Sequence, residues 1–421
     1  MMLKKIILAA AAVAMMIPNN VNAQANPAGQ RFDGLDYNTI TTAVPFMRIS
    51  PDARSGAMGD VGLALSPDAN AQFWNVAKIA MSEKDAGLSI SYTPWLKDLV
   101  NDINLTYLAG YFKFGEEDNK NQAVSLGMRY FSLGSISYTD NNAQSLGTGQ
   151  PREFALDAGY SRKLSEKVSI GLSGKYISSN IINGAAAGTT NASPGSSFAV
   201  DFGAFYTTPV GQDLGEGLGQ RLNVGIAVTN LGQKLSYSAN RKDFLPTNLG
   251  IGAAYEYNID EYNKLTFALD LNKLLVPSPG YERDSSGAIT GRTYPTEKSV
   301  IDGVFSSFGD APEGGSEELK EVMVSFGAEY GYQDQFFARA GYFRESELKG
   351  DRQYFTLGLG VKYNIFGLNF AYLVPSGNGA NRNPLSNTLR FSLMFDFDDF
   401  SSIVKGKPKQ DDKNSRDSKD D

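Results

Sequence analysis

The side chains that most often perform acid–base and nucleophilic chemistry are unevenly represented in this chain. It has 46 aspartates and glutamates, but no histidine and no cysteine. The absence of histidine excludes the usual Ser-His-Asp triad, the usual general base near neutral pH and imidazole metal ligands. The absence of cysteine excludes disulfides and thiolate metal sites.

The remaining candidates for chemistry do not form a pattern typical of a catalytic site. Asp396, Asp398 and Asp399 lie at the end of an apolar segment, which favours solvation at a membrane interface over a cation site. Gly211–Gly219 lacks the lysine and the strand-to-helix setting of a phosphate-binding loop. We therefore expect no enzyme, no cofactor and no metal site.

The elements that carry these side chains follow a period of two residues. Residues 389–397 read LRFSLMFDF, in which every second residue is apolar and the others include Arg390, Ser392 and Asp396. Successive side chains of a strand point to opposite faces, so one face of this strand contacts an apolar medium and the other a polar one. About fourteen such segments follow one another, which predicts an all-β transmembrane barrel of antiparallel strands over residues 86–397. They lie near 86–96, 101–114, 121–133, 152–163, 166–178, 197–208, 221–231, 246–258, 263–274, 320–332, 335–344, 352–363, 366–374 and 387–397.

The connections between these segments alternate in length. Short turns at 115–120, 163–166, 258–262, 332–335 and 364–365 alternate with long connections at 134–151, 179–196, 232–245, 275–319, 345–351 and 375–386. Only 209–220 is longer than the other short connections. Outer-membrane barrels have short periplasmic turns and long external loops, so both termini are expected in the periplasm.

The N-terminus has the features of an export signal. Lys4 and Lys5 precede the apolar run Ile6–Ile17, and Val21–Ala23 provides a small-residue cleavage site. We expect residues 1–23 to be a signal peptide that is removed after this site. Two of the 39 lysines and arginines lie in it, so 37 basic residues face 46 acidic ones in the exported chain. This acidity disfavours nucleic acid as a partner.

Two further segments lie outside the barrel pattern. Residues 24–85 combine Gly, Pro and Asn turn signals with short apolar patches. A barrel of about fourteen strands has a lumen too wide for its own side chains to fill. We therefore predict that residues 24–85 form a plug in the lumen. Residues 398–421 are almost entirely charged and polar, and they are predicted to be a disordered periplasmic tail.

Two of the predicted external loops are unexpectedly apolar. The first contains Trp95, Leu96, Leu99 and Val100, and the longest, 275–319, contains Tyr281, Tyr294, Phe305 and Phe308. Apolar side chains on an external loop suggest contact with a protein partner or a membrane surface. The alternative is that these side chains fold back and cap the lumen.

A family resemblance is carried by residues 50–80, which read SPDARSGAMGDVGLALSPDANAQFWNVAKIA. Here the chain resembles the FadL-like outer-membrane barrels and, within them, the PorV/PorQ group of type IX secretion system proteins. The residues that carry the likeness, and that we assign to the plug, are Arg54, Gly59, Asp60, Asp68, Asn70, Trp74 and Asn75. Val76 departs from the proline common in the family's Trp-Asn-Pro-Ala turn, and the charged tail is a second departure.

The resemblance implies a location and a set of partners. Proteins of this group lie in the outer membrane of Bacteroidetes-like Gram-negative cells, in contact with lipid and lipopolysaccharide, beside a large outer-membrane translocon barrel. They receive the C-terminal domain of secreted cargo and deliver it to a surface sortase and attachment complex. On this basis we expect a cargo carrier with a plugged lumen. The alternatives are a FadL-like transporter of small hydrophobic molecules and a surface lipid hydrolase, which would have to act without histidine.

Overall fold

The structure, a computed structural model, describes residues 38–95, 102–116, 119–139, 142, 144–181, 193–210, 219–238, 241–285, 289–375 and 388–398. The chain divides into two compact units, Met1–Asn38 and Thr39–Asp421, and the second contains all the secondary structure given below. The expected signal peptide, the tail from residue 399 and the loop residues Leu96, Leu99 and Val100 lie outside the described residues.

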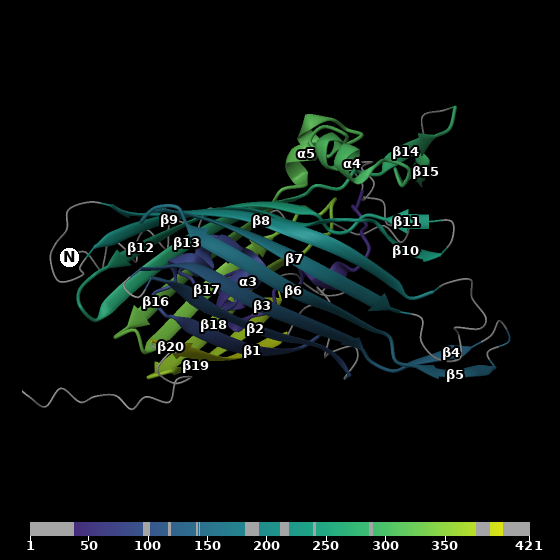
Figure 1. The fold of residues 1–421 in the computed structure, drawn as a ribbon. Helices are drawn as coiled ribbons and strands as arrows, with labels where there is room; N and C mark the ends of the chain where they lie inside the picture. The colour runs from purple at the N-terminus through teal and green to yellow at the C-terminus, as the bar shows by residue number, and fades with distance from the viewer. Residues whose placement is uncertain are drawn as a thin grey trace, which may run out of the picture. The chain divides into compact units, whose positions relative to one another are not determined.

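A closed antiparallel β-barrel forms the body of the second unit (Figure 1). Its 14 strands, in order around the barrel, are β1 (Ala86–Pro94), β2 (Ile103–Glu116), β3 (Asn119–Leu133), β6 (Arg152–Lys163), β7 (Val168–Asn180), β8 (Gly195–Val210), β9 (Gln220–Gly232), β12 (Asn248–Asn258), β13 (Asn263–Leu274), β16 (Met323–Tyr332), β17 (Phe336–Arg344), β18 (Gln353–Tyr363), β19 (Phe366–Pro375) and β20 (Leu389–Phe397). The last strand pairs with the first, Phe397 opposite Ala86, and closes the barrel. The predicted fold class is therefore confirmed.

The two faces of the wall differ as the period of two predicts. In β20, Phe391 and Leu393 are exposed on the outside, whereas Arg390, Ser392 and Met394 are buried on the lumen side. Exposed leucines, phenylalanines and tyrosines cover the outer surface of the other strands in the same way. A closed wall with an apolar exterior leaves no unpaired strand edge for lipid to contact. None of the helices in the described residues has the length and hydropathy needed to cross a membrane.

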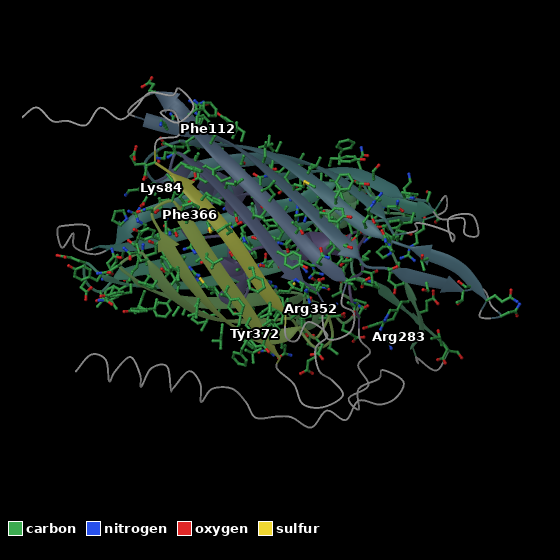
Figure 2. All side chains as sticks on the ribbon, turned by 90° about the horizontal axis from the view of Figure 1, so that it is seen from below. Lys84, Phe112, Arg283, Arg352, Phe366 and Tyr372 are labelled. Carbon is green, nitrogen blue, oxygen red and sulfur yellow. The ribbon has the colours of Figure 1, made fainter. Side chains whose placement is uncertain are left out.

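The two ends of the barrel differ in their connections. Three two-stranded hairpins extend from one end (Figure 1): β4 (Ile136–Thr139) with β5 (Ser145–Gly149), β10 (Leu235–Ser238) with β11 (Arg241–Asp243), and β14 (Gly280–Arg283) with β15 (Ile289–Thr293). Tight turns lie at the other end, where Gln333, Asp334 and Asn364 take positive φ angles of 53°, 50° and 52°. Long connections face outward in outer-membrane barrels, so we call the hairpin end external and the other end periplasmic. Figure 2 shows Lys84 and Phe366 toward the periplasmic end and Arg283 and Arg352 toward the external end.

The long connection 275–319 is more ordered than its sequence predicted. Besides β14 and β15 it contains α4 (Val300–Ser306) and nearly all of α5 (Gly315–Lys320). Ser299 caps α4, since its side chain accepts a hydrogen bond from the backbone N–H of Asp302. Because α5 ends at Lys320, β16 starts at Met323, three residues later than predicted.

Residues 39–85, directly before β1, run through the lumen and include four short helical elements. These are η1 (Pro45–Arg48), α2 (Ala53–Ala57), α3 (Ala71–Trp74) and η2 (Val76–Met81). Near the external end, Phe46 of η1 stacks on Phe131 of β3, with 6.1 Å between ring centroids. Farther along, η2 packs against β3, β6, β7 and β8. Residues 39–85 therefore pack inside the lumen between opposite walls, and we call them the plug. Residues 24–37 of the predicted plug lie outside the described residues.

Candidate functional site

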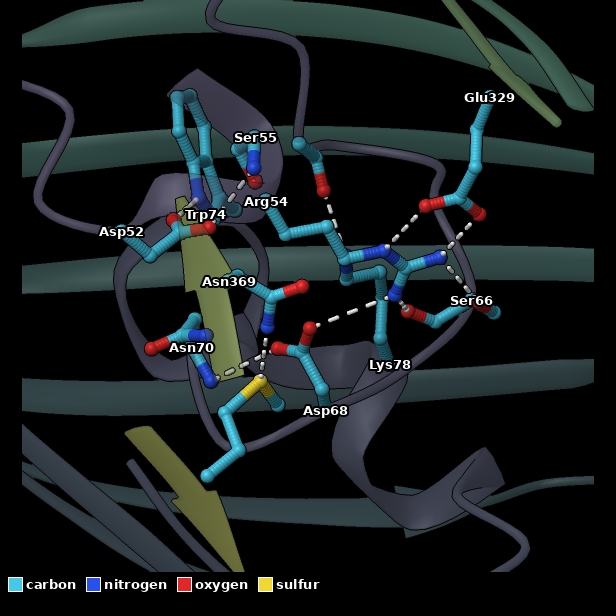
Figure 3. Close-up of polar contacts among 12 residues, drawn as sticks. Asp52, Arg54, Ser55, Ser66, Asp68, Asn70, Trp74, Lys78, Glu329 and Asn369 are labelled. Atoms are coloured by element: carbon cyan, nitrogen blue, oxygen red, sulfur yellow. Dashed lines mark hydrogen bonds and ion pairs between the residues drawn. The ribbon is translucent and has the colours of Figure 1, made fainter. Parts of the chain in front are cut away.

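The centre of the plug is organised around Arg54 of α2 (Figure 3). Its guanidinium forms ion pairs with Glu329 of β16 at 3.2 Å and with Asp68 of the plug at 3.4 Å, and it donates to Ser66 Oγ at 2.8 Å. Glu329 also accepts a 2.6 Å bond from Arg339 of β17. Removing one partner of a buried ion pair leaves an uncompensated charge, so this cluster fixes the plug against the wall.

Asp52 and Trp74 hold two plug helices together. The Asp52 carboxylate accepts hydrogen bonds from the backbone N–H of Ser55, which caps α2, and from Nε1 of Trp74, both at 2.8 Å (Figure 3). Burial and the neighbouring Asp68 raise the pKa of Asp52. The Trp74 ring also packs over Gly62, where an added Cβ would lie 2.0 Å from the indole. The tryptophan of the family motif is therefore a packing centre inside the plug.

Gly59 and Asp60 lie directly against the wall. Gly59 has φ of +72°, and an added Cβ would lie 2.6 Å from backbone atoms of Tyr342 in β17. Asp60 takes φ of 61° and accepts hydrogen bonds from Tyr354 Oη and Arg390 Nη1, both at 2.6 Å. Glycine and aspartate tolerate this left-handed backbone better than most residues.

The other motif residues have separate roles. Asn75 donates from Nδ2 to the Ala204 carbonyl of β8 at 3.0 Å, and its Oδ1 accepts from the backbone N–H of Ala77. The side chain of Asn70 is buried, and neither of its polar atoms has a hydrogen-bond partner within the described part of the chain. Lys78 is also buried and donates to the Gly62 carbonyl at 2.5 Å. Burial lowers the pKa of Lys78 to about 8.

Cavities lie on both sides of the plug. The external cavity has a volume of about 100 Å³ and lies between plug residues such as Ser50 and Trp74 and wall residues such as Asn272 and Ser325. The periplasmic cavity has a volume of about 610 Å³, and Arg54 of the plug contributes to its lining. Charged residues of both signs line both cavities, and the external one adds aromatic rings, amides and hydroxyls.

A three-residue ion cluster joins the plug to an external loop. Glu345 accepts bonds from Arg352 at 2.7 and 3.0 Å, and a longer one from Arg48 of η1 at 3.4 Å. Burial and the positive charge of Arg352 lower the pKa of Arg48 to about 10. One carboxylate therefore faces two guanidinium groups, which leaves one positive charge in excess at the rim of the external cavity.

Helices α4 and α5 form an apolar surface at the external end, which we call the external platform. Its exposed side chains, with their exposed fractions, are Ile301 (56%), Phe305 (73%), Phe308 (54%) and Leu319 (77%). Ion pairs hold the external platform against the barrel. Lys349 contacts Glu317 at 2.6 Å and Glu321 at 2.9 Å, and Lys273 contacts Glu318 and Glu321. The side chains of Lys349, Glu317 and Glu321 are at most 5% exposed.

The external residues singled out from the sequence are placed differently from one another. Phe305 and Phe308 lie on the external platform, and Tyr294 is 42% exposed with Arg241 of the β10–β11 hairpin 5.6 Å above its ring. Tyr281 lies in β14 beside Arg283. Trp95 instead packs against the apolar cluster at the external end of the plug, as the capping alternative expects. The structure therefore does not bring Trp95 and the platform residues together in one surface.

Sequence reasoning missed several residues of this region. Leu319 was not predicted as a partner-binding residue. Lys273 and Lys349, which hold α5 against the barrel and which we call the clamp lysines, were not predicted either. The cluster of Arg48, Glu345 and Arg352 was also missed. A signal for α4 was present, because Ser299 is followed three residues later by Asp302, as in an N-terminal cap. Ile301, Phe305 and Phe308 then follow at helical spacing. The ion clusters gave no such signal, since Arg48 and Glu345 are 297 residues apart.

The closed barrel, its apolar outer surface and the packed plug define an integral outer-membrane β-barrel protein. The family described as Type IX secretion system protein PorV matches residues 33–281, more than half of the 421 residues. The chain belongs to the PorV family.

Solved structures similar to this chain include two toluene transporters and a FadL homologue. The toluene transporter TbuX of Ralstonia pickettii is 13% identical with a TM-score of 0.46, and the match covers 82% of this chain and 98% of TbuX. The toluene transporter TodX of P. putida is 12% identical with a TM-score of 0.46, and the match covers 82% of this chain and 98% of TodX. A FadL homologue of Pseudomonas aeruginosa is 11% identical with a TM-score of 0.42, and the match covers 86% of this chain and 99% of the homologue. None of the curated proteins compared with the chain matches it.

Proposed function

We propose that this barrel is a cargo carrier of the type IX secretion system. It binds the C-terminal domain of a secreted protein at its external end, beside the large translocon barrel. It then delivers the cargo to the surface sortase and attachment complex. Membership of the PorV family supports the secretion role, and the absence of histidine supports a role in binding rather than catalysis.

The observation that carries this proposal is the external platform. The platform exposes more than half of each of four large apolar side chains. Large apolar patches on a surface that faces water commonly mark sites of protein contact. The clamp of Lys273 and Lys349 holds α5 in place, so the platform presents these side chains on a fixed support. A preorganised apolar surface loses less conformational entropy on binding than a mobile loop does.

The transporter alternative has no comparable support from the described lumen. Plug residues line both cavities, and the buried ion pair of Arg54 with Glu329 lies at the periplasmic one. Arg54 ties the plug to the wall through Glu329 and ties two parts of the plug together through Asp68. This arrangement favours a carrier whose lumen stays shut.

The test is capture of a cargo C-terminal domain by the purified barrel in nonionic detergent. The domain is taken from a secreted protein of the same organism. We expect the double variant Ile301→Ser, Phe305→Ser to bind it at least tenfold more weakly, because helix α4 loses both of its exposed large apolar side chains. Lys242→Ser, on the exposed β10–β11 hairpin, is the matched control and should bind normally. Equal binding by all three proteins would contradict the proposal.

A further inference from the structure

The external cavity is built to present polar groups to a ligand. Its lining includes the hydroxyls of Ser50 and Ser325, which are 4% and 1% exposed. Within the residues that the structure describes, neither hydroxyl oxygen has a hydrogen-bond partner. Most buried polar groups in folded proteins are paired, so two unpaired hydroxyls in one cavity indicate that something polar occupies it.

A local irregularity of the wall also points into this cavity. The pairing of β8 with β9 shifts between Val200 and Phe202, and Asn230 takes φ of 59° at this bulge. Asp201 fixes the bulge, because it accepts a 2.7 Å hydrogen bond from the backbone N–H of Asn230. As a result Thr229 and Asn230 both line the cavity. Bulges commonly re-aim side chains in this way beside binding sites.

The charges around the cavity leave one cation without an equal partner. Lys175 pairs with Asp201 at 2.6 Å, and Asp60 pairs with Arg390 at 2.6 Å. Arg48 and Arg352 share the single carboxylate of Glu345. Their side chains keep 20% and 30% of their surface exposed, so an anion can reach them from outside.

The size and the remaining lining restrict the ligand further. Met47, Phe73, Trp74 and Phe343 add apolar side chains to the polar lining of the cavity. Its volume of about 100 Å³ is well below the roughly 300–1,000 Å³ of ordinary small-molecule sites. The cavity therefore suits one terminal group on a short apolar stem, and it is too small for a long lipid chain.

We propose that the external cavity binds the C-terminal carboxylate of an apolar polypeptide end, with Arg48 and Arg352 as the charged partners. The polypeptide source rests on the proposed carrier function, since cargo is the polypeptide that this barrel meets at its external end. A guanidinium binds a carboxylate through paired N–H donors, and Arg352 already does so with Glu345. Arg48 contacts Glu345 at 3.4 Å and the weak acceptor Met323 Sδ at 3.1 Å. It is therefore the guanidinium better placed to turn toward a second carboxylate.

The chain provides its own reporter for this binding. It has two tryptophans, and Trp74 lines the cavity whereas Trp95 does not. In a Trp95→Phe background, the fluorescence of the full-length barrel in nonionic detergent reports Trp74 alone. The probes are acetyl-Gly-Gly-Leu with a free C-terminal carboxylate, the same peptide as its C-terminal amide, and decanoate as a free fatty acid.

We expect the free-acid peptide to bind at least tenfold more tightly than the amide. Arg48→Gln and Arg352→Gln should each abolish this preference, whereas Arg283→Gln, in the external β14 strand, should keep it. If Arg352→Gln does not fold, Arg48→Gln alone still tests the inference. Its contact with Glu345 is the longer one, so its loss should disturb folding less. Equal binding of acid and amide, or a preference that survives Arg48→Gln, would overturn the inference.

The other outcomes separate this site from the carrier function. Arginine-dependent binding of decanoate without binding of either peptide would also overturn the inference, in favour of a fatty-acid site. Failure of the peptide assay while the barrel still captures a cargo domain would remove the cavity proposal and leave the carrier function standing. Failure to capture a cargo domain while the peptide still binds would remove the carrier function and leave the carboxylate site standing.

Discussion

At the scale of single residues, the plug is held by close contacts and by charges that have lost most of their water. Gly59 lies against the backbone of β17, Arg54 bridges plug and wall, and Lys78 is buried among plug residues. Each of these positions admits few alternatives, because the neighbouring atoms already belong to the barrel wall. Substitutions here should loosen the plug while the strand pairing of the barrel persists.

Gly59→Ala should destabilise the plug. The new methyl group would meet the backbone of Tyr342 at 2.6 Å, in a left-handed conformation that already costs a non-glycine residue about 1–3 kcal/mol. We expect a lower midpoint of thermal unfolding in detergent and a measurable ion conductance in planar bilayers. Gly174→Ala is the control, because an added Cβ there meets nothing within 4 Å. If the two variants behave alike, the plug does not depend on this contact.

Lys78 should make the stability of the protein depend on pH. Burial lowers its pKa from 10.5 to about 8 in the folded protein, so between these values the unfolded chain binds more protons. Stability should therefore rise as pH increases from about 8 to 10.5, by roughly 3 kcal/mol at most for this group. The difference in thermal midpoint between the wild type and Lys78→Met, followed across this range, isolates the effect. A difference that stays constant with pH would show that Lys78 titrates normally.

At the scale of elements, the external platform depends on ion pairs rather than on an apolar core of its own. Helix α5 rests on Lys349 and Lys273, and the loop that carries Lys349 also carries Glu345, which contacts Arg48 of the plug. The same short loop therefore joins the platform to the plug. A substitution in this loop should therefore loosen both the platform and the plug, and the platform to a greater extent.

Lys349→Met should release α5 from the barrel. It removes the lysine that pairs with the buried Glu317 and one of the two lysines that pair with Glu321, and losing a partner in a buried pair costs about 3–5 kcal/mol. We expect faster hydrogen–deuterium exchange over residues 299–320, unchanged exchange in the barrel strands, and weaker capture of the cargo domain. Lys242→Met, an exposed lysine of the β10–β11 hairpin, should change none of these. Unchanged exchange in α5 would mean that the clamp is not what holds the platform.

The elements also differ in how far the sequence could predict them. The strands were predictable because lipid outside and a polar lumen inside impose a period of two on every one of them, as in β20. The helices of the external platform were missed because they are only seven and six residues long and sit among turn residues. The contacts of the candidate sites, such as Arg54 with Glu329, join residues 275 apart and depend on barrel closure, which no local pattern encodes.

At the scale of the whole molecule, the barrel provides a lipid-embedded support with a filled lumen and a structured external end. Closure of β20 on β1 removes the free edges, and the plug separates the external cavity from the periplasmic one. These features suit a protein that holds a partner at the cell surface without opening a passage. They also explain how a chain with no histidine and no cysteine can take part in secretion, since binding needs neither.

The central claim, delivery of cargo to the cell surface, is tested most directly by deleting the gene for this chain and measuring cargo at the surface. We expect cargo to be lost from the surface and to keep its C-terminal domain. Expression of the wild-type barrel should restore delivery, whereas the double variant Ile301→Ser, Phe305→Ser should not. Normal cargo at the surface of the deleted strain, with its C-terminal domain removed, would contradict the account.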